Sequence, residues 1–363
     1  MTNTILDTSL TIEFIVQKLW EYEDKDCFKI ENLASYKVEN DTNPAFMSRI
    51  VRVFLKWNTS TGIDTVLLKI PGFQNPGKQE DTSQVDLFLP QAHTKECEFY
   101  SYFTKLNDLN LKLPKYYYGH HYSLLHNHGA IIMEDLSKSA KTDNMFPGFT
   151  NEQVEAVVVE LAKLSAASWK NPGWIQKVGR RIKGAEHFIL EYRMEPLFQP
   201  DSLDKVSYVE EPYPSGIPPA CLHSDLWSAN ILWKTDPEGN PSSELAAIID
   251  WQMAKAGNPA EDILRLLASN TTVQYRRKNY ERILKLYVKT VNEIMQLEFI
   301  TYEQIYKAYH ESMAYESILA VFGAPLYCNM ESVTGGPNSK ELKEELLWRT
   351  QALVEETLNY FQL

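Results

Sequence analysis

The stretch that decides the fold is His223-Ser224-Asp225-Leu226-Trp227-Ser228-Ala229-Asn230. An aspartate followed five residues later by an asparagine is the spacing of the catalytic loop in kinases. There the aspartate takes the proton of the attacking hydroxyl and the asparagine binds Mg²⁺. Asp225 is therefore the predicted catalytic base and Asn230 a predicted metal ligand. We expect His223 to hold the loop backbone by hydrogen bonds rather than to carry protons.

A second carboxylate follows the loop along the chain. Residues 245–249 form a short apolar run that ends at Asp250, twenty residues after Asn230. A carboxylate at the end of a buried strand is a hard oxygen ligand of the kind that Mg²⁺ prefers, so Asp250 is the second predicted metal ligand. Trp227 is the candidate for the acceptor pocket, because its place inside the loop puts it near the acceptor hydroxyl.

A lysine and a glutamate further upstream supply the expected cation for the nucleotide phosphates. Residues 51–57 alternate apolar and polar, residues 58–62 resemble a turn, and residues 65–70 form a second apolar strand, which together predict a hairpin. Lys69 lies near the end of that second strand. Pro90 precedes a predicted helix in which Glu96 shares a face with three aromatic residues. A strand lysine held by a helix glutamate is the arrangement that reaches the α- and β-phosphates of ATP.

The segment Met133-Glu134-Asp135-Leu136 ends another apolar strand, at the boundary between a β-rich and a helical part of the chain. A hinge backbone in this place could bind an adenine edge. From Thr150 onward the pattern becomes helical, and Thr150 with Gln153 has the spacing of a capping box. Residues 201–219 read as an irregular connection, and residues 259–360 as amphipathic helices.

These elements predict an α+β chain with two lobes. The expected nucleotide-binding lobe covers residues 1–134 and consists of an antiparallel sheet plus a helix. The larger, mainly helical lobe covers residues 135–363 and carries the catalytic loop, the metal site and the acceptor-binding helices. The hinge is expected near residues 133–138.

The composition of the chain narrows the classes of function that we expect. The 363 residues carry a formal net charge of −12 and a pI near 5.3, which disfavours nucleic-acid and membrane-surface roles. The four cysteines form no Cys-x-x-Cys pair, no signal peptide or membrane span is apparent, and we expect a cytoplasmic protein without an obvious protein partner. His120, His121, His126 and His128 could suggest zinc, but they lack a zinc-site spacing and are better explained as polar residues of an exposed hairpin.

The acceptor is expected to be a small molecule. A protein kinase needs a peptide-docking segment after its metal-binding aspartate, but only eleven residues separate Asp250 from Asp262 here, and a helix is predicted to start at Pro259. Aromatic residues of the C-terminal helices (Tyr315, Phe322, Tyr327 and Trp348) could line an acceptor pocket, and core packing explains them equally well.

A family resemblance rests on motifs spread from about residue 30 to residue 350. They are Phe46-Met47-Ser48, Lys69, Glu96-x-x-Phe99-Tyr100, Met133-Glu134-Asp135-Leu136, Leu161-Ala162-x-Leu164-x-Ala166-x-Ser168-Trp169, residues 223–233, residues 248–252 and Gly257-Asn258-Pro259-Ala260-Glu261-Asp262. Together they resemble the CHK kinase-like (ecdysteroid-kinase-like) family, in its nematode-type subgroup, within the choline kinase and aminoglycoside phosphotransferase superfamily.

The resemblance implies a protein-kinase-like fold with a five-stranded sheet in the first lobe, and ATP and Mg²⁺ as cofactors. It implies the roles given above for Asp225, Asn230, Asp250, Lys69 and Glu96, and nucleotide contacts from Ser48. Asp262 is implied as a buried support of the catalytic loop. The expected acceptor is the hydroxyl of a steroid-like or other lipophilic alcohol.

Two departures from the family pattern keep alternatives open. Ser224 stands where the family usually has glycine, and Asn43-Pro44-Ala45 replaces a small glycine-bearing loop. A catalytically weak pseudokinase acting as a binding or regulatory module is one alternative. A kinase of the choline or ethanolamine type, with an aromatic and acidic box for its substrate, is the other.

Overall fold

The computed structural model describes residues 4–6, 8, 10–40, 48–72, 82–122, 129–180, 182 and 215–362. The chain divides into two compact units. The first comprises residues 1–105, 113–138 and 182–184, and the second comprises residues 106–112, 139–181 and 185–363. The predicted lobe boundary after residue 134 and the hinge near 133–138 stay predictions.

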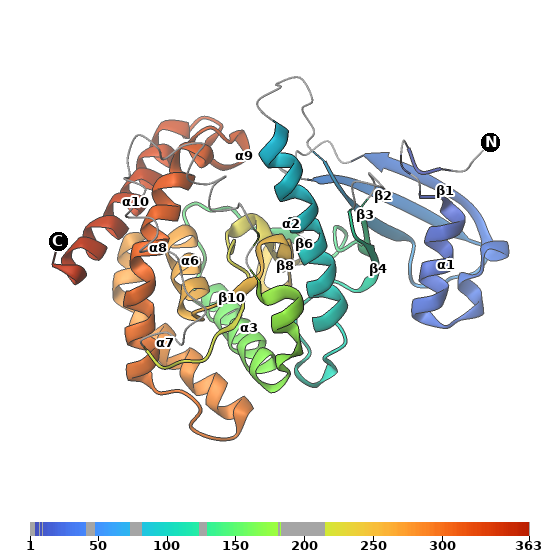
Figure 1. The fold of residues 1–363 in the computed structure, drawn as a ribbon. Helices are drawn as coiled ribbons and strands as arrows, with labels where there is room; N and C mark the ends of the chain where they lie inside the picture. Colours follow the sequence, from blue (N-terminus) through green and yellow to red (C-terminus); the bar gives the residue numbers. More distant parts are fainter. Residues whose placement is uncertain are drawn as a thin grey trace. The chain divides into compact units, whose positions relative to one another are not determined.

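The first unit contains the five-stranded antiparallel sheet (Figure 1). Its strands, in spatial order, are β1 (Leu33–Asn40), β2 (Ser48–Trp57), β3 (Thr65–Pro71), β5 (Ala130–Glu134) and β4 (Tyr116–His120). The predicted hairpin is confirmed, because β2 and β3 pair in the register Ile50 to Lys69. Strand β4 ends at His120, and residues 123–128 lie outside the described part.

The core of the first unit lies between the sheet and helix α1 (Ile12–Glu23). Alternate residues of β2 are buried because successive strand side chains point to opposite faces, and they meet the apolar face of α1. This core includes Ile15, Val16 and Leu19 of the helix with Val51, Val53, Val66 and Leu68 of the sheet.

Helix α2 (Thr82–Phe103) begins earlier than the sequence predicted, with Pro90 inside it. A proline removes one helical hydrogen bond and usually ends or bends a helix. Phe88 and Leu89, just before the proline, are both buried. Packing of this apolar turn favours continuation of the helix through Pro90.

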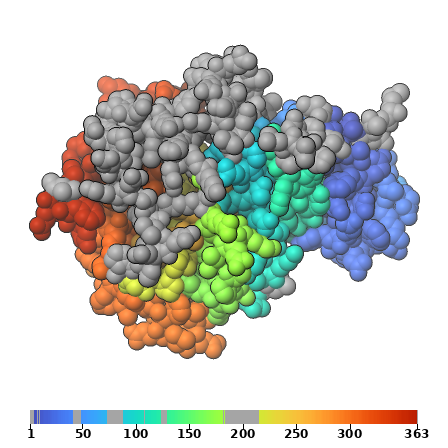
Figure 2. All heavy atoms as spheres, viewed as in Figure 1, coloured from blue at the N-terminus to red at the C-terminus, as the bar shows by residue number. Residues whose placement is uncertain are grey.

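The second unit is mainly helical. Its helices are α3 (Asn151–Lys170), α6 (Ala260–Asn270), α7 (Val273–Met295), α8 (Tyr302–Cys328), α9 (Glu331–Thr334) and α10 (Ser339–Phe361). The capping box of Thr150 and Gln153 is confirmed at the start of α3. Helix α7 is amphipathic: Ile283, Leu284 and Tyr287 are among its buried residues, whereas Glu281, Arg282 and Lys285 are exposed. Orange and red spheres mark the C-terminal helices at the surface of this unit (Figure 2).

Two small sheets in the second unit carry the predicted motifs. One pairs β7 (Ala220–Leu222) with β10 (Lys255–Gly257), and the other has the order β6 (Ala140–Thr142), β8 (Ile231–Thr235) and β9 (Pro241–Ile248). The catalytic-loop residues therefore connect β7 to β8. The α+β class is confirmed. Among the described helices, none combines the length and apolarity that a membrane span requires.

Candidate active site

Asp262 holds the backbone at the start of the predicted catalytic loop. The N–H groups of His223 and Ser224 donate to its two carboxylate oxygens, at 2.7 and 2.9 Å. Asp262 lies in the first turn of α6 and is buried. Burial raises the pKa of this carboxyl group, whereas the two backbone hydrogen bonds lower it. The path of the chain between β7 and the loop is thus fixed by one side chain.

His223 ties the loop to the strand that precedes Asp250. Its Nε2 lies 2.8 Å from the carbonyl oxygen of Ile249, and its Nδ1 accepts the N–H of Asp225 at 3.2 Å. A carbonyl can only accept and a backbone N–H can only donate, so Nε2 donates and Nδ1 accepts in these two bonds. Both ring nitrogens are engaged by the backbone, which supports the holding role expected for this histidine.

Ser224 adopts the backbone conformation that glycine prefers. Its φ is +67°, in the left-handed region, where a Cβ is unfavourable. Its Oγ is buried and has no hydrogen-bond partner among the described residues. The family that this chain resembles usually has glycine here, which would avoid both the unfavourable Cβ and the buried hydroxyl. The serine therefore adds strain at this point of the loop.

The fold brings Asp225, Asn230 and Asp250 to one place. The amide nitrogen of Asn230 donates to the carbonyl oxygen of Asp225 at 2.8 Å and approaches its Oδ2 at 3.3 Å. The N–H of Ile249 donates to the carbonyl oxygen of Asn230 at 3.0 Å, so Asp250 follows directly beside Asn230. The carboxylate of Asp225 keeps 28% of its side-chain surface exposed, which leaves it accessible to a reactant.

The donor set fits a hard divalent cation that takes its remaining ligands from elsewhere. Because the amide nitrogen of Asn230 faces Asp225, its Oδ1 is the atom that would remain for a cation. The carboxylate of Asp250, which accepts from Nε2 of Gln252 at 3.3 Å, would supply further oxygens. Over the described part of the chain, no group of three or more His, Cys, Asp or Glu side chains could hold a metal ion. Mg²⁺ commonly uses one or two protein carboxylates together with substrate phosphates and water.

Arg265 of α6 is a site residue that the sequence reasoning missed. Its Nη2 lies 3.4 Å from Oδ1 of Asp225, and its Nη1 lies 3.7 Å from Oε2 of Glu316 on α8. Burial alone would lower the pKa of Arg265, but Tyr327, Glu316 and Asp225 raise it. Burial raises the pKa of Glu316 to about 8. The sequence signal that could have revealed Arg265 is its charge within the apolar run Ile263-Leu264-Arg265-Leu266-Leu267.

Trp227 is half-buried and packs against Tyr327 of α8, with ring centroids 5.2 Å apart. Asn270, at the end of α6, donates to the carbonyl oxygen of Leu226 at 3.1 Å. The loop is therefore bounded by α6 on one side and by an aromatic pair on another, and Trp227 stays the candidate for the acceptor side.

In the first unit, Lys69 and Glu96 form the predicted ion pair. The Nζ of Lys69 lies 2.7 and 2.9 Å from the two carboxylate oxygens of Glu96, and the two side chains are 10% and 2% exposed. Ser48 begins β2 and is buried, opposite Pro71. The preceding Asn43-Pro44-Ala45 and Phe46-Met47 lie outside the described residues.

The predicted adenine-binding segment continues from β5. Met133 pairs with Leu67 of β3, and the N–H of Glu134 donates to the carbonyl oxygen of Lys115 at 2.9 Å. Asp135 is engaged within its own unit: it accepts the N–H of Ser137 at 3.0 Å and lies 3.5 Å from Nε of Arg52. Its carboxylate is thus held within the protein, and any nucleotide contact of residues 133–136 stays a prediction.

Two of the four histidines that were weighed for a zinc site, His120 and His121, lie among the described residues. His121 lies 3.3 Å from Glu98, and the Nε2 of His93 lies 2.9 Å from the carbonyl oxygen of His120. His126 and His128 lie outside the described residues. Cys27, Cys97, Cys221 and Cys328 form no disulfide bond in the structure.

The fold places the chain in the protein-kinase-like class, as predicted. The structure resembles choline kinase from Cryptosporidium parvum Iowa II, with a TM-score of 0.52, 11% identity, and coverage of 94% of this chain and 96% of that one. It also resembles a candidate aminoglycoside phosphotransferase from Ralstonia eutropha JMP134, with a TM-score of 0.50, 10% identity, and coverage of 95% and 98%.

A family model described as "Uncharacterized oxidoreductase dhs-27" matches residues 3–211 and 202–363, and the chain belongs to this family. An uncharacterized kinase-like protein of Caenorhabditis elegans, D1044.1, is 24% identical over 91% of this chain and 94% of its own length. The uncharacterized oxidoreductase dhs-27 of the same organism is 23% identical over 84% of this chain, which corresponds to 40% of its own length.

Proposed function

We propose that this protein transfers the γ-phosphate of ATP to a hydroxyl group of a small molecule. The observation that carries the proposal is the grouping of Asp225, Asn230 and Asp250 in one loop region that Asp262 and His223 hold in place. The likeness to a protein named kinase-like, over nearly the whole chain, supports the same reaction class. The oxidoreductase name belongs to a longer protein, of which this chain matches 40%.

In the proposed reaction Asp225 orients the acceptor hydroxyl and accepts its proton. The acceptor oxygen forms a bond to the γ-phosphorus while the bond from that phosphorus to the β–γ bridging oxygen breaks, which releases ADP. Asn230 and Asp250 would hold Mg²⁺, which supplies positive charge for the phosphate oxygens. Lys69, fixed by Glu96, would anchor the α- and β-phosphates, with Ser48 and residues 133–136 as further nucleotide contacts.

The proposed acceptor is a steroid-like or other lipophilic alcohol that lies against Trp227. A choline or ethanolamine type of acceptor is the second candidate, favoured by the tilted aromatic pair of Trp227 and Tyr327 beside the loop. An aromatic face attracts a quaternary ammonium group, whereas a neutral alcohol uses the same rings as apolar surface.

The test measures ADP release by the purified full chain with ATP and Mg²⁺, in the presence of pooled sterol, amino-alcohol and glycoside acceptors. Mass spectrometry then identifies any phosphate ester. Asp225→Asn removes the base with little change in shape, and Asp236→Asn is the matched control, because Asp236 lies in a turn of the same unit. We expect acceptor-dependent activity that only the first variant loses.

Two outcomes would count against the proposal. Full activity of the Asp225→Asn variant would remove Asp225 from the chemistry. Tight ATP binding with no phosphate ester from any pool would favour the binding or regulatory module instead, in line with the strained Ser224.

A further inference from the structure

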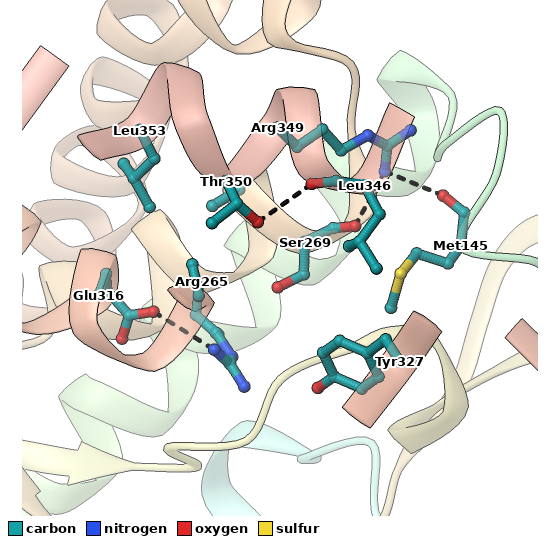
Figure 3. A pocket seen from close by; sticks show the side chains of 11 residues that line it. Met145, Arg265, Ser269, Glu316, Tyr327, Leu346, Arg349, Thr350 and Leu353 are labelled. Atoms are coloured by element: carbon teal, nitrogen blue, oxygen red, sulfur yellow. Dashed lines mark hydrogen bonds and ion pairs between the residues drawn. The ribbon is translucent and has the colours of Figure 1, made fainter. Parts of the chain in front are cut away.

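Two buried arginines line one small cavity in the second unit (Figure 3). Arg265 comes from α6 and Arg349 from α10, and their residues are 8% and 3% exposed. The cavity measures about 20 Å³, which is room for a single water molecule and excludes an acceptor body. The cavity therefore does not explain either arginine as a binding group for a substrate.

Arg349 has the bonding that a structural arginine requires. It donates to the carbonyl oxygens of Met145, Pro147 and Ser269 at 2.7–3.1 Å, and its Nε donates to Glu345 at 2.9 Å. The bond to Met145 is visible in Figure 3. Full hydrogen bonding offsets the cost of taking the guanidinium out of water.

Arg265 lacks this compensation. Its Nε is buried without a hydrogen-bond partner, and no bond from its guanidinium to a backbone carbonyl is found within the described residues. Its two contacts with carboxyl groups are long, at 3.4 Å to Asp225 and 3.7 Å to Glu316. A buried charge that is incompletely bonded contributes little to stability, so fold stability does not account for an arginine at this position.

What Arg265 does reach is the predicted catalytic base. Its guanidinium approaches Oδ1 of Asp225, while the amide of Asn230 approaches Oδ2 of the same carboxylate from the loop. The carboxylate is thus contacted through both oxygens, from two different elements. Glu316, which is 3% exposed, lies 3.7 Å from the other terminal nitrogen of the guanidinium, Nη1.

We propose that Arg265 is a positioning residue of the phosphotransfer: anchored by Glu316, its guanidinium fixes the carboxylate of Asp225 in the orientation that receives the acceptor proton. This inference rests on the proposed function. It predicts that the side chain affects the rate of the chemical step and leaves nucleotide binding nearly unchanged, because Arg265 contacts the base. A displacement of reacting groups by about 1 Å costs about a hundredfold in rate.

The experiment compares Arg265→Lys with Arg349→Lys, two identical replacements on the walls of the same cavity. ATP turnover by the full chain is measured with the acceptor selected from the pools, together with KM for ATP and the thermal midpoint. We expect Arg265→Lys to lower kcat by about tenfold or more at an unchanged KM for ATP. Arg349→Lys should lower the thermal midpoint and leave kcat of the folded protein within about twofold.

Arg265→Ala with added guanidinium ion provides a second arm. The deleted side chain leaves a hole beside Asp225, and free guanidinium, well below denaturing concentrations, should restore part of kcat. If Arg265→Ala does not fold, Arg265→Lys alone tests the role of Arg265, because lysine retains the charge and most of the side-chain volume.

The results separate the two proposals. A wild-type chain that phosphorylates no acceptor would overturn the proposed function and this inference together. An active wild type whose Arg265→Lys variant keeps its kcat, or loses only thermal stability as Arg349→Lys does, would overturn the role of Arg265 alone.

Discussion

Replacing Ser224 by glycine should stabilise this protein, although the residue lies in the middle of its predicted catalytic loop. The φ angle of +67° places the serine Cβ in the left-handed region, which costs about 1 kcal/mol or more for a residue other than glycine. The buried and unpartnered Oγ adds a cost on the order of 1 kcal/mol. Glycine loses about 0.5–1 kcal/mol more backbone entropy on folding than other residues. The net expectation is a gain of about 1 kcal/mol.

Urea unfolding followed by tryptophan fluorescence measures this gain. Trp20 and Trp57 lie in the first unit and the other six of the eight tryptophans lie in the second, so the signal reports mainly on the unit that contains Ser224. With a slope of about 3 kcal/mol per molar urea, the midpoint should rise by about 0.3 M.

Ser224→Ala is the control that separates the two causes. It removes the hydroxyl but keeps a Cβ at positive φ. Its free energy of unfolding should therefore be lower than that of Ser224→Gly by about 0.5 kcal/mol, which is the left-handed strain less the backbone entropy that glycine loses. A glycine variant no more stable than the wild type would refute the strain at this position. Equal midpoints for glycine and alanine would assign the whole effect to the hydroxyl.

Three further predictions concern buried charges. The pKa of Glu316 is raised to about 8 in the folded protein, so between about pH 4.5 and 8 the folded state keeps a proton that the unfolded state releases. Its contribution to stability is complete below pH 4.5 and is lost as pH rises through 8, at up to about 1.4 kcal/mol per pH unit. Urea midpoints across this range should fall less steeply for Glu316→Gln than for the wild type, and parallel curves would contradict the assignment. Lys69→Met should lower the stability of the first unit by about 3 kcal/mol, because it removes the Lys69 ammonium group from the buried carboxylate of Glu96. Adding Glu96→Leu should recover most of this loss without restoring ATP turnover; additive losses in urea unfolding would show that the two side chains do not depend on each other. Asp262→Ala should lower the free energy of unfolding by about 2–4 kcal/mol, since two buried loop N–H groups lose their acceptor. An unchanged unfolding midpoint would argue against the support that Asp262 gives the loop.

Local patterns in the sequence predicted much of the fold. The alternation in residues 51–57 predicted β2, and the capping-box spacing of Thr150 and Gln153 predicted the start of α3. Such signals are readable because each depends on residues that are near neighbours in the chain. Pro90 misled the prediction of α2, because the buried turn before it outweighs the local preference of proline.

The loop from His223 to Asn230 separates the features that the sequence predicts from those that require the folded structure. Its sequence alone determined the spacing of Asp225 and Asn230 and the expected chemistry, since that pattern spans eight consecutive residues. Only the tertiary structure placed Arg265 against Asp225, because the two residues are 40 positions apart and meet when α6 packs against the loop. The two bonds that Asp262 makes with the backbone N–H groups of His223 and Ser224, from 39 and 38 residues away, were equally unreadable. The spacing of neighbouring residues can be read directly from the sequence, whereas contacts between distant segments form only when the chain folds.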